Sequence, residues 1–173
     1  MKVKGYKTIL FTSNLSTASR IAFRHAALLA NQFRAKIILL HVMEPLPSNY
    51  EGHMIGLFGK DKWMEVVKQH KEEARHALVG KVSPRQMAKT ALSEFYMESV
   101  TNETGYDIPG NEIVIENGEV VEVIIKVAKE QACDLIILGA GQGLLSGTSV
   151  GQTIKSTLKK AKIPVLIVPS ASE

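Results

Sequence analysis

Glycine and hydroxyl residues are concentrated in one stretch of the chain, directly behind a short apolar run. The glycines are Gly139, Gly141, Gly143, Gly147 and Gly151, and the hydroxyl residues are Ser146, Thr148, Ser149 and Thr153. Glycine lets the backbone approach a ligand without a clash from a Cβ atom. The N–H groups that open a helix, expected here at Gly151, attract anions. The stretch therefore predicts a phosphate site, and the alternative is a glycine-rich loop that binds nothing.

Two common phosphate-binding motifs do not match the chain. A Walker A loop requires Gly-Lys-Ser/Thr, whereas Gly59-Lys60 is followed by Asp61 and Gly80-Lys81 by Val82. The dinucleotide fingerprint G-x-G-x-x-G fails because Leu144 stands where the third glycine would be. The missing fingerprint argues against a dehydrogenase that transfers hydride.

The cysteine and the histidines form no catalytic or metal-binding pattern. Cys133 is the single cysteine, which excludes an intramolecular disulfide and a cysteine-based zinc site. We expect it to be a small buried apolar residue. No two histidines are four residues apart, the spacing of ligand pairs on a helix; they are His25, His41, His53, His70 and His76. We therefore expect no catalytic residues and no metal ligands.

Short apolar runs alternate with segments of helical periodicity, which is the pattern of an α/β domain with a mostly parallel sheet. Strands are expected at 8–11, 36–42, 112–116, 134–138 and 163–168. Helices are expected from three apolar stripes, namely Ala22, Ala26, Leu29 and Phe33, then Val121, Ile124, Ile125 and Ala128, then Ile154, Leu158 and Ala161. Open α/β sheets bind ligands beyond the carboxyl ends of their strands. The turn at Thr12 to Asn14 and the glycine stretch should then flank one crevice.

Residues 45–110 are predicted to be an insertion in this pattern. A loop rich in proline and glycine is followed by an expected helix with one face made of Trp63, Val66, Val67, His70, Ala74 and Ala77. Ser83-Pro84-Arg85-Gln86 resembles a capping box with proline at the first helical position, and it predicts a second helix through Met87, Ala91 and Phe95. The segment is too short and polar to bury a core of its own. We expect residues 1–173 to form a single domain.

Composition and charge narrow the class of protein. The chain has 173 residues, of which 45% are hydrophobic and 22% charged, as in a globular domain. No apolar run reaches the roughly 18–20 residues of a membrane span, and the run behind the basic N-terminus is too short for a signal peptide. A cytoplasmic location without membrane attachment is expected. The net charge of +4 is small for a nucleic-acid binder, so Lys155, Lys159, Lys160 and Lys162 are expected to form a solvated helix face.

The sequence resembles the universal stress proteins over nearly its whole length apart from 45–110. The resemblance rests on ILFTSNLS at 9–16, His41-Val42, DLIILG at 134–139, Gly151, and IPVLIV from Ile163 to Val168. It implies a five-stranded, parallel, twisted open sheet of order 3-2-1-4-5 with helices on both faces, the adenine nucleotide alpha hydrolase-like fold. It also implies a homodimer formed through the last strand, 163–168. That strand is apolar and expected at the sheet edge, where unpaired backbone groups favour pairing with a second copy.

Many members of this family bind ATP through G-x2-G-x9-G-Ser/Thr, an Asp after the first strand and a Val after the second. Here Val42 fits the Val position, and Gly141 and Gly151 match the G-x9-G part of the motif. Leu138 replaces the first glycine, with Gly139 one residue later; Gln152 replaces Ser/Thr; and Asn14 replaces Asp. An unpaired buried group costs about 1–3 kcal/mol, so two mismatches correspond to a hundredfold or greater loss of affinity.

The resemblance implies a small stress-response protein that binds an adenine nucleotide, ATP or AMP, in a regulatory and non-catalytic way at an altered glycine-rich loop. Magnesium would accompany ATP. Asn14 and Val42 would contact the base and ribose, and the phosphates would lie against Gly139, Gly141, Gly151, Gln152 and Thr153, with Thr12 completing the expected site. The alternative is a nucleotide-free homodimeric interaction module that uses the insertion at 45–110.

Overall fold

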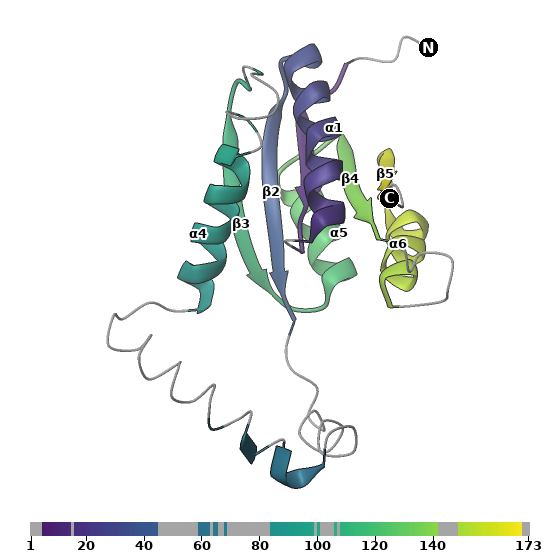
Figure 1. Ribbon diagram of the computed structural model, residues 1–173. Coiled ribbons are helices and arrows are strands. Elements are labelled where there is room, and N and C mark those ends of the chain that lie inside the picture. Colours follow the sequence, from purple (N-terminus) through teal and green to yellow (C-terminus); the bar gives the residue numbers. More distant parts are fainter. Residues whose placement is uncertain are drawn as a thin grey trace. The chain divides into compact units, whose positions relative to one another are not determined.

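The computed structural model describes residues 5–14, 16–44, 59–62, 64, 65, 68, 84–98, 100, 106, 108–141 and 149–170 (Figure 1). The chain divides into two compact units, one made of Met1–Glu44 with Ala88–Glu173 and the other of Pro45–Met87. In the second unit, residues 60–62, 64, 65 and 68 are helical. The expected helix face from Trp63 to Ala77 lies outside the described residues. The sheet and the candidate site belong to the first unit.

The first unit contains a sheet of five strands, all paired in parallel, in the order β3-β2-β1-β4-β5. The strands are β1 (Thr8–Thr12), β2 (Lys36–Met43), β3 (Asn111–Asn117), β4 (Leu135–Ala140) and β5 (Val165–Pro169). The predicted fold class and strand order are confirmed. Most expected strand bounds differ from the observed ones by one residue, and two differ by two residues: β4 continues through Gly139 to Ala140, and β5 begins at Val165 instead of Ile163.

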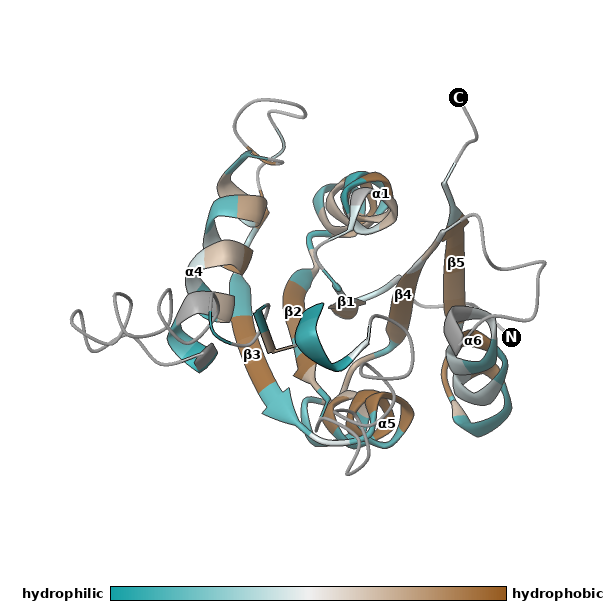
Figure 2. Cartoon of the chain, turned by 60° about the horizontal axis from the view of Figure 1, so that its bottom comes forward, coloured by the Kyte–Doolittle hydropathy of each residue, from teal (hydrophilic) through white to brown (hydrophobic). Residues whose placement is uncertain are grey.

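Helices cover both faces of this sheet (Figure 2). Strand residues alternate between the two hydrophobic cores that lie on these faces. The helices are α1 (Thr17–Phe33), α4 (Pro84–Met97), α5 (Val120–Glu130) and α6 (Ser149–Lys160). Ile9 and Phe11 of β1 pack against α1 and against Phe95 of α4. Leu10, on the opposite face, packs in the core that includes α5 and Ile154 of α6. None of the helices in the described ranges is both long enough and apolar enough to cross a bilayer.

The buried faces of three helices differ in part from the predicted stripes. Ala22 and Ala26 of α1 are fully buried as predicted, but Phe33 is 42% exposed and meets the Tyr6 ring edge-on. On α6, Leu158 is 49% exposed and Thr157 is fully buried, with its hydroxyl donating to the Thr153 carbonyl at 2.8 Å. On α5, Ile125 is half-buried, and the core positions belong to Val121, Val123, Ile124, Val127 and Ala128. The spacing of apolar residues in the sequence therefore does not identify the buried face of a helix to within one residue.

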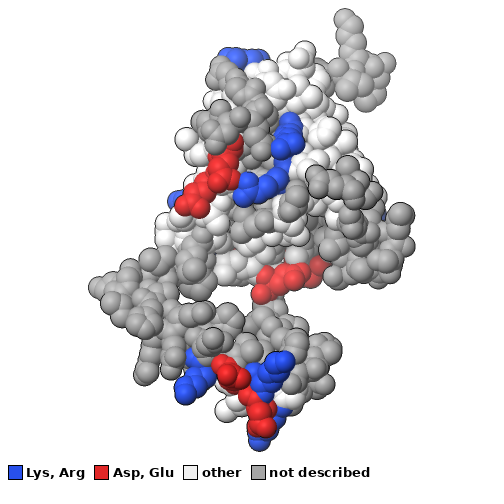
Figure 3. All heavy atoms as spheres, in the orientation of Figure 1, with Lys and Arg blue, Asp and Glu red and all other residues white. Residues whose placement is uncertain are grey.

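An aromatic cluster joins α4 to the core under α1. The Phe95 ring lies 6.1 Å from Phe11 and 5.4 Å from Phe23, and Tyr96 lies 5.7 Å from Phe23. Helix α4 begins at Pro84, as the capping pattern predicts. The Arg20 guanidinium lies over the Phe95 ring and pairs with Glu98 at 2.6 Å. On part of the face drawn in Figure 3, acidic and basic side chains lie side by side.

Replacing Phe95 by Ala should lower the free energy of unfolding by about 3–5 kcal/mol, because the change leaves a cavity in the aromatic cluster. Phe33→Ala removes the same atoms from a position that is 42% exposed and should cost clearly less. Urea unfolding of the two variants measures the difference. Equal losses would show that Phe95 is not part of the core.

Candidate functional site

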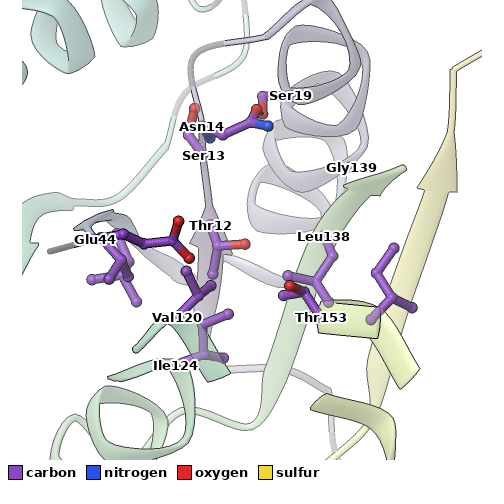
Figure 4. Close-up of a pocket in the computed structure, with 13 residues that line it drawn as sticks. Thr12, Ser13, Asn14, Ser19, Glu44, Val120, Ile124, Leu138, Gly139 and Thr153 are labelled. Carbon is purple, nitrogen blue, oxygen red and sulfur yellow. Dashed lines mark hydrogen bonds between the residues drawn. The ribbon is translucent and has the colours of Figure 1, made fainter. Parts of the chain in front are cut away.

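A cavity of about 320 Å³ opens where β1, β2 and β4 end (Figure 4). This volume is at the lower end of the roughly 300–1,000 Å³ typical of small-molecule sites. Thr12 is in register with Leu40 of β2 and with Leu138 of β4. The described lining consists of Thr12, Ser13, Asn14, Ser19, Leu40, Val42, Glu44, Val120, Ile124, Leu138, Gly139, Thr153 and Ile154.

The cavity lies at the point where the order of the sheet reverses. From β1 the chain continues to β2 and β3 on one side of the sheet, and β4 and β5 lie on the other side. After β1 the chain enters α1 on one face, and after β4 it reaches α6 on the opposite face. Diverging connections of this kind leave a crevice at the carboxyl ends of the strands, where α/β sheets bind ligands.

One wall of the cavity is aliphatic. Leu40 and Leu138 are 0% and 4% exposed, and Ile124 and Ile154 come from α5 and α6. Val42 and Val120 are half-buried and extend this wall toward the opening. A wall of this chemistry suits the flat, weakly polar face of a base or another ring.

The polar rim on the β1 side is a turn held by side chains that open α1. The Asn14 carboxamide oxygen accepts hydrogen bonds from the Ser19 hydroxyl at 2.8 Å and from the Ser16 backbone N–H at 3.1 Å. Ser16 is the N-cap of α1, and its hydroxyl accepts from the Ser19 N–H. Because that oxygen is already engaged twice, the group that Asn14 offers to a ligand is its amide nitrogen, which only donates.

A second set of contacts ties this turn to β2. The Ser13 N–H donates to the Leu40 carbonyl at 2.9 Å. The Ser13 carbonyl lies 2.8 Å from Nδ1 of His41, which places a protonated Nδ1 as the donor. His41 therefore supports the rim from the side and is absent from the described lining of the cavity.

Gly139 lies inside β4 and not in the loop where the sequence pattern placed it. A Cβ atom at this position would lie 2.7 Å from the Ala18 carbonyl oxygen and 2.9 Å from its carbon. Glycine at 139 is therefore required for the close approach of β4 to the first turn of α1. Gly139 also lines the cavity. The same residue therefore allows α1 to pack closely on β4 and places no side chain in the cavity.

Five of the eight predicted site residues line the cavity: Thr12, Asn14, Val42, Gly139 and Thr153. The other three do not belong to the described lining. Gly141 directly follows β4, and Gly151 and Gln152 lie in the first turn of α6, where Gly151 is buried and Gln152 exposed. Ser146 and Thr148, also expected to contribute hydroxyls, lie outside the described residues.

The sequence also contains Gly-x-Ser-x-Gly at 147–151, the spacing of the nucleophile elbow of hydrolases. In that elbow the serine lies on a sharp turn directly between a strand and a helix. Here β4 ends at Ala140 and α6 begins at Ser149, with residues 141–148 between them. Ser149 therefore does not occupy the position that the motif requires.

Cys133 is buried at the start of β4, on the α5 face of the sheet, as expected for a small apolar residue. Burial, with a smaller contribution from the neighbouring Asp134 charge, raises the pKa of the thiol to about 11. A thiol with this pKa is a poor nucleophile at neutral pH. The residue is therefore structural.

Glu44 is the charged residue of the described lining, and the sequence reasoning did not single it out. Its side chain extends from the end of β2 toward Thr12 and lines the cavity (Figure 4). The rule that ligands bind beyond carboxyl strand ends applies to β2 as well as to β1 and β4. Applied two residues past Val42, it would have identified this carboxylate.

Comparisons with known proteins agree with the resemblance seen in the sequence. The model of the universal stress protein family matches residues 5–169. Universal stress protein MJ0577 of Methanocaldococcus jannaschii is 25% identical over 164 residues, which cover 94% of this chain and 94% of that protein. Its solved structure covers 98% of this chain and 99% of its own, with a TM-score of 0.61 at 22% identity.

Two further solved structures contain a nucleotide. A universal stress protein in complex with cAMP has a TM-score of 0.59 at 18% identity and covers 95% of this chain and 97% of its own. A universal stress protein family member from Arabidopsis thaliana with AMP bound has a TM-score of 0.53 at 18% identity, with coverages of 96% and 93%. At these identities the likeness shows a shared fold.

Gly139→Ala should lower the free energy of unfolding by about 1–3 kcal/mol, because the new Cβ would push against backbone atoms that cannot move freely. Gly141→Ala is the matched control, since no atom lies within 4 Å of its added Cβ, and it should change stability by no more than about 0.5 kcal/mol. Urea unfolding compares the two. Similar values would contradict the role of Gly139 in joining β4 to α1.

Proposed function

The chain belongs to the universal stress protein family, and we propose that it binds an adenine nucleotide in the cavity at the ends of β1, β2 and β4. The observation that carries the proposal is the meeting of Thr12, Val42, Gly139 and Thr153, from four different elements, at one cavity. Two proteins of the same fold hold cAMP and AMP. Those ligands motivate the choice of an adenine nucleotide for this chain.

The two sides of the cavity suit the two ends of a nucleotide. The base would lie on the aliphatic wall that includes Val42 and Ile124. The phosphates would lie toward Gly139, Gly141 and the first turn of α6, where the opening N–H groups of a helix have no acceptor within the helix. Gly151, Gln152 and Thr153 belong to this turn or directly follow it.

Among the described lining residues, Glu44 is the single ionisable side chain and no Lys or Arg is present. Phosphates would therefore rely on backbone N–H groups and on the helix dipole. The low volume and the lack of a lining cation favour AMP over ATP, and ATP would bring Mg²⁺ to offset its charge.

We propose that the output of binding is occupancy and not turnover. Phosphoryl transfer relies on charged groups that position the phosphate and a base that orients the nucleophile. The described lining offers a single carboxylate, at the β2 side of the cavity. A ligand that binds the folded chain stabilises it and shifts its population, which suffices for regulation.

The folded chain should be stabilised by AMP. A ligand at a hundredfold excess over its dissociation constant contributes about 2.7 kcal/mol, which corresponds to a rise in Tm of about 5–10 °C for a chain of this size. A melting scan with and without millimolar AMP, and with ATP and Mg²⁺, measures the rise. The protein extract is searched for co-purified nucleotide in parallel. No bound nucleotide and no rise would exclude the proposal.

Restoring the family residues sharpens this experiment. Asn14→Asp supplies a second, charged oxygen that the turn does not use, and Gln152→Ser supplies a compact hydroxyl; together they should tighten AMP binding about tenfold or more. Affinity is measured by calorimetric titration, because Asn14→Asp also stabilises the start of α1. Asn111→Asp, at the amino end of β3, carries the same charge change as a control. An unchanged affinity would contradict the placement of Asn14 and Gln152.

The edge strand β5 supports a second proposal, that the chain is a homodimeric interaction module. Pro164 accepts from Ile136 on β4, and Ser170 donates to Ala140. Backbone groups of alternate residues point the same way, so the N–H groups of Val165 and Ile167 point away from β4. These donors are available to an identical strand of a second copy, and β5 is the last strand on its side of the described sheet.

The wild-type chain should scatter light as a dimer, at twice its mass of 18.9 kDa. Ile167→Pro removes one outward N–H and leaves the bonds to β4 in place, so it should give a monomer with an unchanged circular dichroism spectrum. Ile167→Val retains the N–H and should remain a dimer. A monomeric wild type at micromolar concentration would contradict the proposed interface.

A further inference from the structure

Glu44 brings the single formal charge to the described lining of the cavity. It follows β2 directly, and its carboxylate extends toward Thr12 (Figure 4). The side chain makes no hydrogen bond or ion pair within the described part of the chain. A carboxylate only accepts hydrogen bonds. This one therefore offers two free oxygens to a ligand that carries donors.

The cavity has a negative side at Glu44 and, across from it, the amino-terminal part of α6. Glu44 directly follows β2, whereas Gly139 lies in β4 and Thr153 in α6, with Thr12 between the two sides (Figure 4). Because β2 and β4 flank β1 on opposite sides, the carboxylate and the opening of α6 are separated across β1. A ligand with an anionic end and a donor end is therefore oriented by charge alone, with its anion at α6.

The buried wall and the exposed opening of the cavity suit different parts of a nucleotide, the base and the ribose. Leu40 and Ile124 on the aliphatic wall are almost fully buried, whereas Glu44 is exposed at the opening. The least polar part of a nucleotide, its base, is favoured at the buried wall. The ribose, which carries two neighbouring hydroxyl donors, then lies at the opening beside the carboxylate.

Asn14 does not compete for this role. Its carboxamide oxygen accepts from Ser16 and Ser19 and is not free for a ligand hydroxyl. A carboxylate that binds the ribose 2′-hydroxyl is also the solution found in dinucleotide-binding α/β sheets. We propose that Glu44 accepts the hydrogen bonds of the ribose 2′- and 3′-hydroxyls and makes the site selective for ribonucleotides with a free 2′-hydroxyl. This inference rests on the proposed binding of an adenine nucleotide.

Two changes to the ligand test the role of Glu44, because replacing Glu44 should weaken the binding of AMP and strengthen the binding of a 2′-phosphorylated ligand. Removing the 2′-hydroxyl leaves the carboxylate one donor short, and adding a 2′-phosphate places a second anion against it. The wild type should bind AMP about tenfold tighter than 2′-deoxy-AMP. It should bind adenosine 2′,5′-bisphosphate more weakly still, because like charges repel.

Calorimetric titration of these three ligands, and of IMP, is carried out on the wild type and on Glu44→Ala. The variant should lose about tenfold in affinity for AMP, bind AMP and 2′-deoxy-AMP nearly equally, and gain affinity for the bisphosphate. Glu130→Ala removes the same charge from the far end of α5, about 15 Å from Val120 along the helix, and should leave all three affinities unchanged. The opposite signs separate recognition by Glu44 from general damage to the cavity.

Three outcomes would overturn the proposal. The first is a wild type that binds AMP and 2′-deoxy-AMP equally. The second is a Glu44→Ala variant that keeps the wild-type ratios. The third is a variant that loses discrimination between AMP and IMP instead, which would assign Glu44 to the base. Each of these leaves nucleotide binding itself intact. A wild type that binds none of the ligands would overturn the proposed function together with this inference.

Discussion

β1 pairs in parallel with β2 on one side and β4 on the other, so Thr12 lies between Leu40 and Leu138 at the carboxyl edge of the sheet. The chain leaves β1 toward α1 and reaches α6 after β4, and these helices lie on opposite faces. The described connections therefore diverge at the carboxyl edge of the sheet, and the cavity opens there. The cavity results from this pairing, and the proposed contacts of Thr12, Val42, Gly139 and Thr153 lie along its walls.

Close packing at the rim decides which polar groups remain for a ligand. Gly139 lets β4 approach Ala18 of α1, and the Asn14 side chain holds the first turn of that helix through Ser16 and Ser19. Gly139 and the Asn14 oxygen thus have structural roles in the packing and capping of α1. The described lining then presents the amino-terminal part of α6 on one side and the carboxylate of Glu44 at the β2 side. The α6 side of the cavity therefore attracts anions, and the Glu44 side attracts hydrogen-bond donors.

The sheet was predictable because its strands are buried on both faces and form uninterrupted apolar runs, as in Ile37 to Leu40. The strand order came from the family resemblance, since apolar runs do not indicate which strands are neighbours. The helix faces were harder. Phe33 and Leu158 continue an apolar stripe in the sequence, yet they are 42% and 49% exposed, whereas Thr157, the polar neighbour of Leu158, is fully buried.

The candidate site was predictable where a strand end and a residue type coincide, as at Thr12 and Val42. It was not predictable where the role depends on neighbours that the sequence does not reveal. Gly139 appeared to belong to a loop because its contact with Ala18 is distant in sequence. The engagement of the Asn14 oxygen with Ser16 and Ser19 was not predictable, because these bonds depend on the local backbone. The capping pattern located Pro84, but it carries no information about the partners of α4.

Whether a nucleotide occupies this cavity is tested most directly by the backbone amide spectrum of the ¹⁵N-labelled chain during titration with AMP. Shifts are expected together at Thr12 to Asn14, at Val42 to Glu44, at Gly139 to Gly141 and at Gly151 to Thr153, with the amino ends of the strands unchanged. A spectrum that does not respond to millimolar AMP, or that shifts only away from these four segments, would contradict the assignment of the cavity.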